Sequence, residues 1–236
     1  MKVFSSGSCR LVTTINHGWD KITPIHSMFY NFNGINFLGK LHNTKQHIQF
    51  LKFIKDEITI PDNILPQFLT SYNEHTCGTH CEPIILLPCK KENIKKQIDD
   101  CEWYIFEICS LKLYNNSGFE VQHELTNQIQ ETLQSEQELW DDLHIIRSML
   151  PNKKILFQCH FRPNIIYNDE SKRIVKREII YNILEQFCRQ NEKTYLYDPS
   201  ILLQSNHSLF DNDTHFIQNG HFESFTYMYN NYLTKI

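Results

Sequence analysis

The chain begins with Met1-Lys2-Val3-Phe4-Ser5-Ser6-Gly7-Ser8-Cys9-Arg10-Leu11. This run predicts a short apolar strand, a turn of small residues and the first turn of a helix. Such a turn places Ser8 and Cys9 beside free backbone N–H groups, at the positive end of a helix dipole that favours a thiolate or a developing oxyanion. We therefore expect a nucleophile here, either Cys9 or Ser8. The alternative is that Cys9 is a buried structural cysteine, as free cysteines often are.

Length and charge restrict the classes of protein to which the chain can belong. With 236 residues it is long enough for one α/β domain with a proper core. The net charge of −4 and the pI near 6.3 disfavour a nucleic-acid partner. The sequence has neither a membrane-length apolar run nor the apolar segment of a signal peptide, so it predicts a cytoplasmic protein with no membrane partner. Without a secretion signal, the eight cysteines are expected to be reduced thiols.

Predicted strands alternate with predicted helices, which is typical of a parallel sheet with helices on both faces. The expected strands are Lys2–Ser6, His26–Leu38, Trp103–Cys109, Lys154–Cys159 and Tyr195–Tyr197. The expected helices follow Cys9 and then cover Thr44–Ile54, Glu124–Leu150, Ser171–Gln190 and Glu223–Leu233. We predict one three-layer α/β domain over residues 1–236 with a central five-stranded parallel sheet. Residues 56–101, which four prolines interrupt, are expected to form an irregular insertion or cap.

Polar residues follow the predicted strands. Ligands of parallel sheets bind at the carboxyl ends of the strands, so we expect these residues to converge on one site. They are Ser8 and Cys9, Gly39 and Lys40, Ser110, His160 and Arg162, and Asp198. Within this set, the guanidinium of Arg162 can bind an anionic group through two parallel hydrogen bonds. The alternative for His160-Phe161-Arg162 is an ordinary surface loop.

Glu107 lies inside an otherwise apolar strand. An unpaired buried carboxylate is costly, so Glu107 needs a partner, which Lys112, Arg162 or a histidine could supply. We expect a structural buried ion pair. Substrate binding by Glu107 is the alternative role.

His215 is the candidate base, because it follows Asp211 and Asp213 closely and precedes the last predicted helix. A carboxylate near in sequence can hold the imidazole in the tautomer that accepts the proton of a nucleophile. The alternative is a solvated acidic turn that caps the last helix.

The segment His75-Thr76-Cys77-Gly78-Thr79-His80-Cys81 contains four soft metal ligands. Structural zinc sites normally combine two well-separated pairs of ligands, and four ligands in one short loop would be cramped. We therefore predict no metal site and expect a loop over the mouth of the active site. Zinc held by His75, Cys77, His80 and Cys81 is the alternative.

Three of these features together resemble the SGNH/GDSL hydrolase superfamily. They are Gly7-Ser8-Cys9 after the first strand, Gly39 after the second, and the aspartates that precede His215. The Gly-Ser-Cys triplet is particularly similar to the GSCFA and related sugar-acylation branches. The resemblance implies a flavodoxin-like three-layer fold and the activity of an esterase, a lipase or a carbohydrate acyltransferase.

The resemblance also implies roles for residues near the first three strands. Cys9 stands in the place of the family's serine nucleophile, and Ser8 in that of the preceding aspartate. Gly39 matches the glycine that donates to the oxyanion in the second block. Ser110 is the candidate for the third block, where the family has an asparagine.

The last block of the family is Asp-x-x-His, and this chain departs from it. The aspartate position is Asn212, which leaves Asp211 or Asp213 to orient His215.

The sequence therefore predicts an acyl-transfer enzyme that acts on an acylated carbohydrate, as a sugar acetyltransferase or an acetyl esterase. Cys9 or Ser8 would attack the acyl carbon, with His215 as the base. No cofactor is required, although a transferase could use acetyl-CoA as its acyl donor, and the partner is a small-molecule or glycan substrate. The departures from the third and last blocks favour the alternative of a non-catalytic module of the same fold that binds a glycan or a nucleotide.

Overall fold

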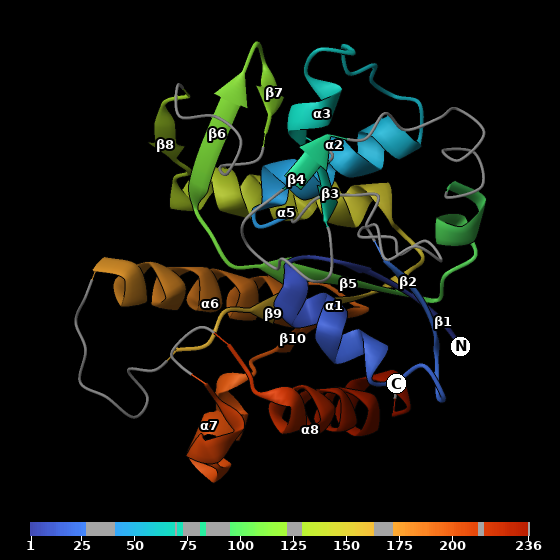
Figure 1. Ribbon diagram of the computed structural model, residues 1–236, viewed down its shortest axis with the longest axis vertical. Coiled ribbons are helices and arrows are strands. Elements are labelled where there is room, and N and C mark those ends of the chain that lie inside the picture. Colours follow the sequence, from blue (N-terminus) through green and yellow to red (C-terminus); the bar gives the residue numbers. More distant parts are fainter. Residues whose placement is uncertain are drawn as a thin grey trace.

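The computed structural model describes residues 1–26, 41–68, 70–72, 81–83, 95–121, 129–162, 172–211 and 215–235 (Figure 1). Its centre is a five-stranded sheet with the order β10-β9-β5-β1-β2, in which every neighbouring pair is parallel. The strands are β1 (Lys2–Ser6), β2 (Thr23–His26), β5 (Trp103–Ile108), β9 (Lys154–Cys159) and β10 (Thr194–Tyr197). The predicted α/β fold with a central parallel five-stranded sheet is confirmed.

Helices cover both faces of the sheet and make three layers. One face carries α1 (Cys9–Asn16) and α8 (Gln218–Met228), which continues as a π-helical turn at Tyr229–Leu233. The other carries α2 (Thr44–Ile54), α5 (Glu136–Met149) and α6 (Lys172–Gln190). In Figure 1, α2 and α5 lie above the sheet, and α1 and α8 lie below it. The short helix α7 (Ser200–Ser205) and the 3-10 turn His207–Leu209 connect β10 to α8.

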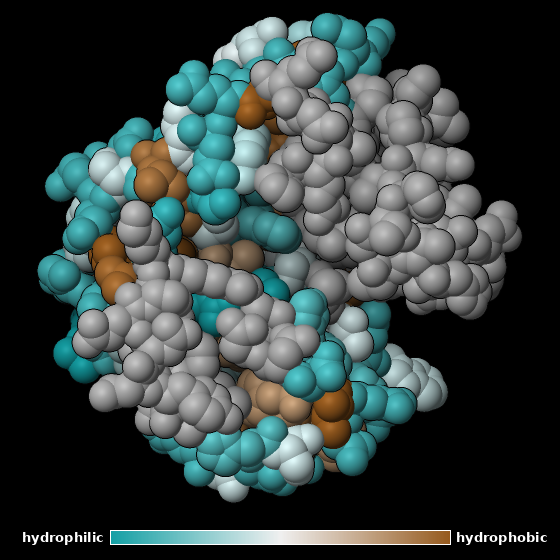
Figure 2. Space-filling view, turned by 60° about the vertical axis from the view of Figure 1, so that its left-hand side comes forward, coloured by the Kyte–Doolittle hydropathy of each residue, from teal (hydrophilic) through white to brown (hydrophobic). Residues whose placement is uncertain are grey.

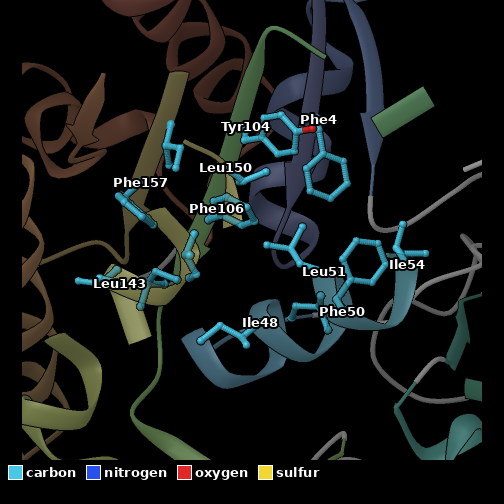
Figure 3. Packing of buried hydrophobic residues seen from close by; sticks show 14 of the residues in the cluster. Phe4, Ile48, Phe50, Leu51, Ile54, Tyr104, Phe106, Leu143, Leu150 and Phe157 are labelled. Carbon is cyan, nitrogen blue, oxygen red and sulfur yellow. The ribbon is translucent and has the colours of Figure 1, made fainter. Parts of the chain in front are cut away.

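Strand β5 is buried along its whole length because it lies inside a sheet that is covered on both faces. Its side chains alternate between two cores. Tyr104 and Phe106 pack with Phe4 on the side of α2 and α5, whereas Trp103 and Ile105 pack on the side of α1 and α8. Figure 3 shows the first of these cores, where aromatic rings from the sheet face helix α2. The packed strands give the site at their carboxyl ends a rigid base.

The region of the expected insertion, residues 56–101, contains short elements. Helix α3 (Leu65–Phe68) precedes an antiparallel pair of strands, β3 (Thr70–Tyr72) and β4 (Cys81–Pro83). A further helical turn covers residues 95–99. In Figure 1, α3, β3 and β4 lie on the same side of the central sheet as α2.

A second excursion follows β5 and was not predicted. It is an antiparallel sheet of β6 (Lys112–Asn116), β7 (Phe119–Glu120) and β8 (Glu131–Leu133). The predicted helix Glu124–Leu150 is therefore wrong at its start, and α5 begins only at Glu136. Ser135 fixes this start through a capping box: its hydroxyl accepts from Glu138 N, and its N–H donates to the Glu138 carboxylate at 2.8 Å.

Two other predicted elements begin elsewhere, whereas α2 has its predicted bounds. β2 begins at Thr23 and pairs with β1 up to His26, and residues 27–38 of the expected strand are not described. Helix α2 is capped by Asn43, whose side chain accepts from Gln46 N at 2.9 Å. The last helix starts at Gln218 rather than Glu223. Among the described helices, none has both the length and the apolar composition needed to cross a membrane.

Candidate active site

The turn after β1 is tied to strand β5 by the carboxylate of Glu107. The backbone N–H of Ser8 donates to Glu107 Oε2 at 2.7 Å, and Arg10 Nε donates to Oε1 at 2.9 Å. Gly7 lies directly against Glu107, and a Cβ at this position would come within 2.6 Å of Glu107 Cβ. Any larger residue at position 7 would therefore displace the carboxylate that holds the turn.

Glu107 forms a buried ion pair, as the sequence predicted, and its partner is Arg10. Lys112 and Arg162, which the sequence suggested as partners, form ion pairs with other carboxylates. Burial alone would raise the pKa of Glu107, but the Arg10 charge and hydrogen bonds from Ser8 outweigh it and hold the pKa below its ordinary value. Glu107 is therefore a fixed negative charge behind the turn.

Ser8 and Cys9 have different places in this turn. Ser8 is the N-cap of α1: its hydroxyl oxygen accepts from Arg10 N at 3.3 Å, and the residue is only 2% exposed. Cys9 is the first residue of the helix, at the positive end of its dipole. The structure describes the backbone of Cys9 but not its side chain.

A cavity of about 490 Å³ opens beside this turn, at the carboxyl ends of the strands. The lining comes from α1, the segment before α2, the turn from β5 into β6, the residue after β9, and α6: Arg10, His42, Cys109, Ser110, Leu111, Lys112, His160, Lys176, Arg177 and Ile180. Two candidates from the sequence, Ser110 and His160, therefore line the same cavity. Figure 2 shows hydrophilic residues in a recess on the face turned forward.

The loop after β5 is fixed by the backbone of His42. Its carbonyl oxygen accepts from Cys109 N at 3.0 Å and from Ser110 N at 3.1 Å, so both N–H groups bind within the protein. The Ser110 hydroxyl accepts from Lys112 N at 3.0 Å. Burial, together with the charge of Glu107, raises the pKa of Cys109 to about 12, so this thiol stays protonated near neutral pH.

His160 is held by Arg177 in the wall of the cavity. Arg177 Nη2 lies 3.3 Å from His160 Nε2, and Nη1 donates to the Phe161 carbonyl at 3.0 Å. A guanidinium only donates hydrogen bonds, so Nε2 of His160 is the acceptor and carries no proton in this contact. His160 is therefore a neutral, oriented imidazole.

His215 is exposed and lies just before α8. Its carbonyl accepts from Asp211 N at 3.0 Å, and an isolated β-bridge joins Phe210 to Phe216 on either side of this turn. The backbone thus brings Asp211 and His215 side by side. Asp213, Lys40 and Gly39 lie outside the described residues.

Helix α8 packs against α1. This packing joins the helix that begins at Cys9 to the helix that follows His215. His221 of α8 pairs with Thr14 of α1, with 2.9 Å between Nδ1 and Oγ1. Burial is the main cause that lowers the pKa of His221 to about 4. Its neighbours His17, His215 and Arg10 also lower the pKa, and Glu107 opposes them. His215 and the Arg10–Glu107 pair therefore both lie close enough to act on His221 electrostatically.

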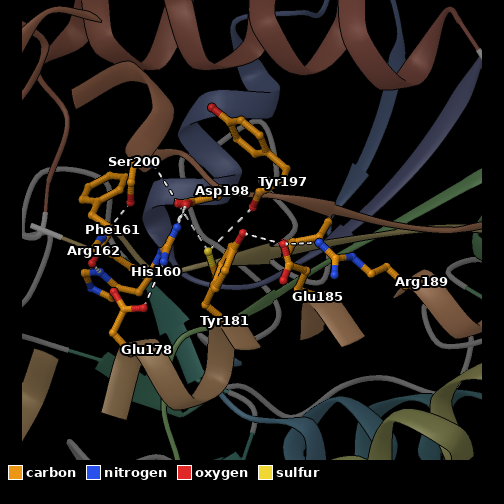
Figure 4. A network of polar contacts seen from close by, with 12 residues as sticks. His160, Phe161, Arg162, Glu178, Tyr181, Glu185, Arg189, Tyr197, Asp198 and Ser200 are labelled. Carbon is orange, nitrogen blue, oxygen red and sulfur yellow. Dashed lines mark hydrogen bonds and ion pairs between the residues drawn. The ribbon is translucent and has the colours of Figure 1, made fainter. Parts of the chain in front are cut away.

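Arg162 lies apart from this cavity, in the polar network of Figure 4. Its guanidinium donates to Asp198, forms an ion pair with Glu178 at 3.0 Å and stacks on the ring of Tyr181 at 3.5 Å. These contacts join the ends of β9 and β10 to α6. Arg162 and Asp198 also line a second cavity of about 500 Å³ along β10.

The predicted metal alternative falls mostly outside the described residues. His75, Cys77 and His80 are not described, and Cys81 is described only as backbone in β4. Within the described ranges, no three His, Cys, Asp or Glu side chains are grouped so that they could hold a metal ion.

Sequence reasoning misses four of the six basic residues in the cavity wall: Arg10, His42, Lys176 and Arg177. Arg10 has a local signal, since it directly follows Cys9 and can reach a carboxylate at the end of a neighbouring strand. The other three come from segments distant in sequence, and only the fold brings them together.

His47 of α2 is a buried imidazole behind the turn. Its Nδ1 lies 2.9 Å from Ser6 Oγ, and its Nε2 lies 3.0 Å from the carbonyl oxygen of Glu107. A carbonyl only accepts, so Nε2 carries the proton and Nδ1 accepts from the Ser6 hydroxyl. Burial lowers the pKa of His47 to about 4, against the opposing effect of Glu107. The neutral ring joins β1, α2 and β5 below the site.

We expect the free energy of unfolding to fall as the pH drops from 6.5 towards 4, because the unfolded chain binds a proton at His47 that the folded protein does not. The pKa of His47 is lower in the folded protein than in the unfolded chain. The stabilisation that comes from keeping His47 neutral is therefore complete above pH 6.5 and is lost as the pH falls from 6.5 to about 4. The part due to His47 is about 3 kcal/mol. Urea titrations between pH 4 and 7 measure it.

His47→Gln should remove the part of the pH dependence of the unfolding free energy that His47 causes. The part that His221 causes should remain. Ser6→Ala is the matched control: it deletes one hydrogen bond but keeps the buried imidazole, so stability should fall at every pH and the slope should remain. If the unfolding free energy of His47→Gln depended on pH as steeply as that of the wild-type protein, His47 would not be the group whose protonation destabilises the fold.

Comparison with known families concerns the larger, N-terminal part of the chain. A family model described as the TviD N-terminal domain matches residues 1–148, which is more than half of the chain. The chain belongs to the TviD N-terminal domain family. The matched range contains the Gly7-Ser8-Cys9 turn, Glu107 and Ser110, and it ends before β9 and His215. A search of curated proteins found no match.

Among solved structures, this member of the TviD N-terminal domain family is similar to a lipolytic protein of the G-D-S-L family from Veillonella parvula DSM 2008. The identity is 6%, 100% of each chain is covered, and the TM-score is 0.51. This likeness confirms the SGNH/GDSL-type fold that the resemblance implied.

Two carbohydrate esterases are also found. A Clostridium thermocellum family 3 carbohydrate esterase has 12% identity over 98% of this chain and 94% of its own, with a TM-score of 0.38. An acetyl xylan esterase from Butyrivibrio proteoclasticus has 13% identity over 55% of this chain and 36% of its own, with a TM-score of 0.29.

Proposed function

We propose that this protein is an acyl-transfer enzyme in which Cys9 is the nucleophile and His215 the general base. One observation carries the proposal: Gly7-Ser8-Cys9 forms the turn from the carboxyl end of β1 into α1, in a fold of the G-D-S-L type. At this place a helix dipole favours a thiolate, and the cavity of about 490 Å³ lies next to it.

Cys9 is preferred to Ser8 because the contacts of Ser8 are structural. Its hydroxyl caps α1, and its N–H binds the buried carboxylate of Glu107. A nucleophile that also served as the helix cap would lose the cap whenever it attacked. Ser8 remains the alternative nucleophile.

The reaction proceeds through a covalent acyl-enzyme. Cys9 Sγ attacks the acyl carbon while His215 takes the thiol proton, and the tetrahedral intermediate expels the alcohol or thiol of the donor, which recovers that proton. A water or sugar hydroxyl then attacks the thioester and gives its proton to His215. The C–S bond breaks, and the released Cys9 thiolate recovers the proton from His215. Asp211 or Asp213 orients His215 in both halves.

The oxyanion would be stabilised by backbone N–H groups at Cys9 and Gly39. The backbone N–H of Ser110 is not among these donors, because it binds the carbonyl of His42. Ser110 can still contribute its hydroxyl from the cavity wall.

We assign an acetylated carbohydrate as the substrate class, on the likeness of the Gly-Ser-Cys triplet to sugar-acylation branches. With water as the acceptor the protein is an acetyl esterase. With a sugar hydroxyl as the acceptor and acetyl-CoA as the donor, it is an acetyltransferase.

The test uses the full chain with p-nitrophenyl acetate, and with acetyl-CoA in the presence and absence of amino- and hydroxy-sugars. We expect release of nitrophenol or of CoA, and a gain of one acetyl group on a peptide that contains Cys9, measured by mass spectrometry. Cys9→Ala should abolish the label and reduce turnover by at least about a thousandfold. Ser8→Ala should keep the label and lower stability by about 1 kcal/mol through loss of the cap.

Labelling of Ser8 in place of Cys9 would reverse the assignment of the nucleophile. Absence of both turnover and label with every donor would favour a binding module that retains this fold.

A further inference from the structure

The cavity beside the nucleophile turn has a strongly basic lining. Of the ten residues that form its wall, two are arginines, two are lysines and two are histidines. None of these described lining residues is Asp or Glu. The basic residues are Arg10, Lys112, Lys176, Arg177, His42 and His160.

The carboxylates that balance part of this charge are not in the wall. Glu107 pairs with Arg10 from inside the protein. Glu131 pairs with Lys112 at 2.8 Å and also interacts electrostatically with Lys176. Each of these carboxylates acts from outside the lining, so the positive groups are the ones that face the space a ligand would occupy.

Arg177 is the most deeply placed of these cations, with 3% of the residue exposed. Two of its hydrogen bonds go to neutral groups, the Phe161 carbonyl and the imidazole of His160. An arginine side chain keeps its charge under all ordinary conditions. Inside a concave wall of low dielectric, such a charge attracts anions more strongly than the same charge on a flat surface.

We infer that this cavity binds an anionic group of the reactant, a phosphate of the acyl donor or a carboxylate of the sugar. Arg177 and Lys176 on α6 and Lys112 of β6 supply the positive charge that the anion meets in the cavity wall. The charge of Arg10 is balanced by Glu107. The anchored group lies beside the turn that carries Cys9, so its binding places the acyl group or the acceptor hydroxyl next to the nucleophile. The identity of the reactants rests on the proposed function; the preference for an anion does not.

The experiment measures binding to Cys9→Ala, in which no acyl-enzyme forms, by isothermal titration calorimetry. One arm compares acetyl-CoA with S-acetylpantetheine, which carries the same thioester without the phosphates. The other compares methyl glucuronoside with methyl glucoside. In one arm or the other, the anionic member should bind at least tenfold more tightly, and its affinity should fall with added salt. The arm that shows the preference identifies the source of the anion.

The charge reversal Lys176→Glu, in the same background, should reduce this affinity at least tenfold. Lys96→Glu changes the net charge equally at a distant exposed site and should leave the affinity unchanged. Circular dichroism verifies that both variants are folded. Equal binding within both pairs of ligands, or an affinity that Lys176→Glu does not lower, would overturn the inference.

The two proposals fail separately. If the cavity prefers the anionic ligand but the wild-type protein shows no turnover, the anion site is supported and the acyl-transfer mechanism is wrong. Turnover at Cys9 without an anion preference keeps the mechanism and removes this site.

Discussion

Replacing His215 by alanine should reduce kcat for deacetylation or acetyl transfer by about 10²- to 10⁴-fold, the usual contribution of a general base, with little change in KM. The expected cause is loss of proton transfer from Cys9. The His215 segment lies just before α8, and both His215 and Arg10 of the nucleophile turn are close enough to lower the pKa of the half-buried His221. Initial rates at saturating donor between pH 5 and 9 measure the effect.

The wild-type rate should rise with pH as His215 loses its proton, and this limb of the profile should be absent from the residual activity of His215→Ala. His207→Ala is the control, because His207 is also an exposed histidine and lies in the 3-10 turn before the candidate base. A wild-type rate in His215→Ala would remove His215 from the mechanism. The next residue to test would then be His160, which already lines the cavity.

The central strands could be predicted from the sequence because a strand that is buried on both faces consists of a nearly continuous run of apolar residues. Trp103–Cys109 and Lys154–Cys159 are almost continuous apolar runs, and the structure has them as β5 and β9. The turn after β1 could also be predicted, because its small residues have few other uses between a strand and a helix.

The start of α5 could not be predicted from the spacing of apolar residues. It depends on the capping box Ser135-x-x-Glu138, a local signal that the apolar spacing does not contain, and on the pairing of β8 with β6, which the linear sequence does not display. The same holds for the cavity wall. Arg177 and His160 are close in sequence, but their pairing depends on the packing of α6 beside β9.

For Glu107, the sequence predicts that a cation must be near but does not predict which residue supplies it. Burial of a carboxylate in β5 predicts that a cation must lie near it. The sequence offers Lys112 as the nearest lysine, yet the chain supplies Arg10, which lies 97 positions away. The parallel pairing of β1 with β5 brings these two residues together, and it cannot be read from either segment alone.

Glu107→Gln should lower the free energy of unfolding by about 3–5 kcal/mol, the usual cost of breaking a buried ion pair from one side. The amide can still accept from Ser8 N, but it no longer compensates the charge of Arg10, whose side chain is 11% exposed. The turn that carries Cys9 should lose its fixed position, so turnover should also fall. Urea titration at pH 7 and the esterase assay measure the two effects.

A double-mutant cycle separates this charge effect from a simple loss of packing. Removing both partners in Glu107→Gln/Arg10→Met should restore much of the stability lost in Glu107→Gln, because no uncompensated charge then remains. Lys112→Met is the control for a solvent-exposed pair and should change stability little. If the double variant were as unstable as the sum of the two single variants, the ion pair would not be what holds the turn.

The pH dependence gives an independent measure of the same pair. The folded pKa of Glu107 lies below its unfolded value, so its contribution is complete above about pH 4.5 and is lost as the pH falls through the lower, folded pKa. This range lies below the one in which His47 and His221 act. Glu107→Gln should therefore flatten the acid end of the stability profile and leave the slope between pH 6.5 and 4.5 intact. Because the same carboxylate binds Ser8 N–H, the acid loss of stability and the acid loss of an ordered nucleophile turn should occur together.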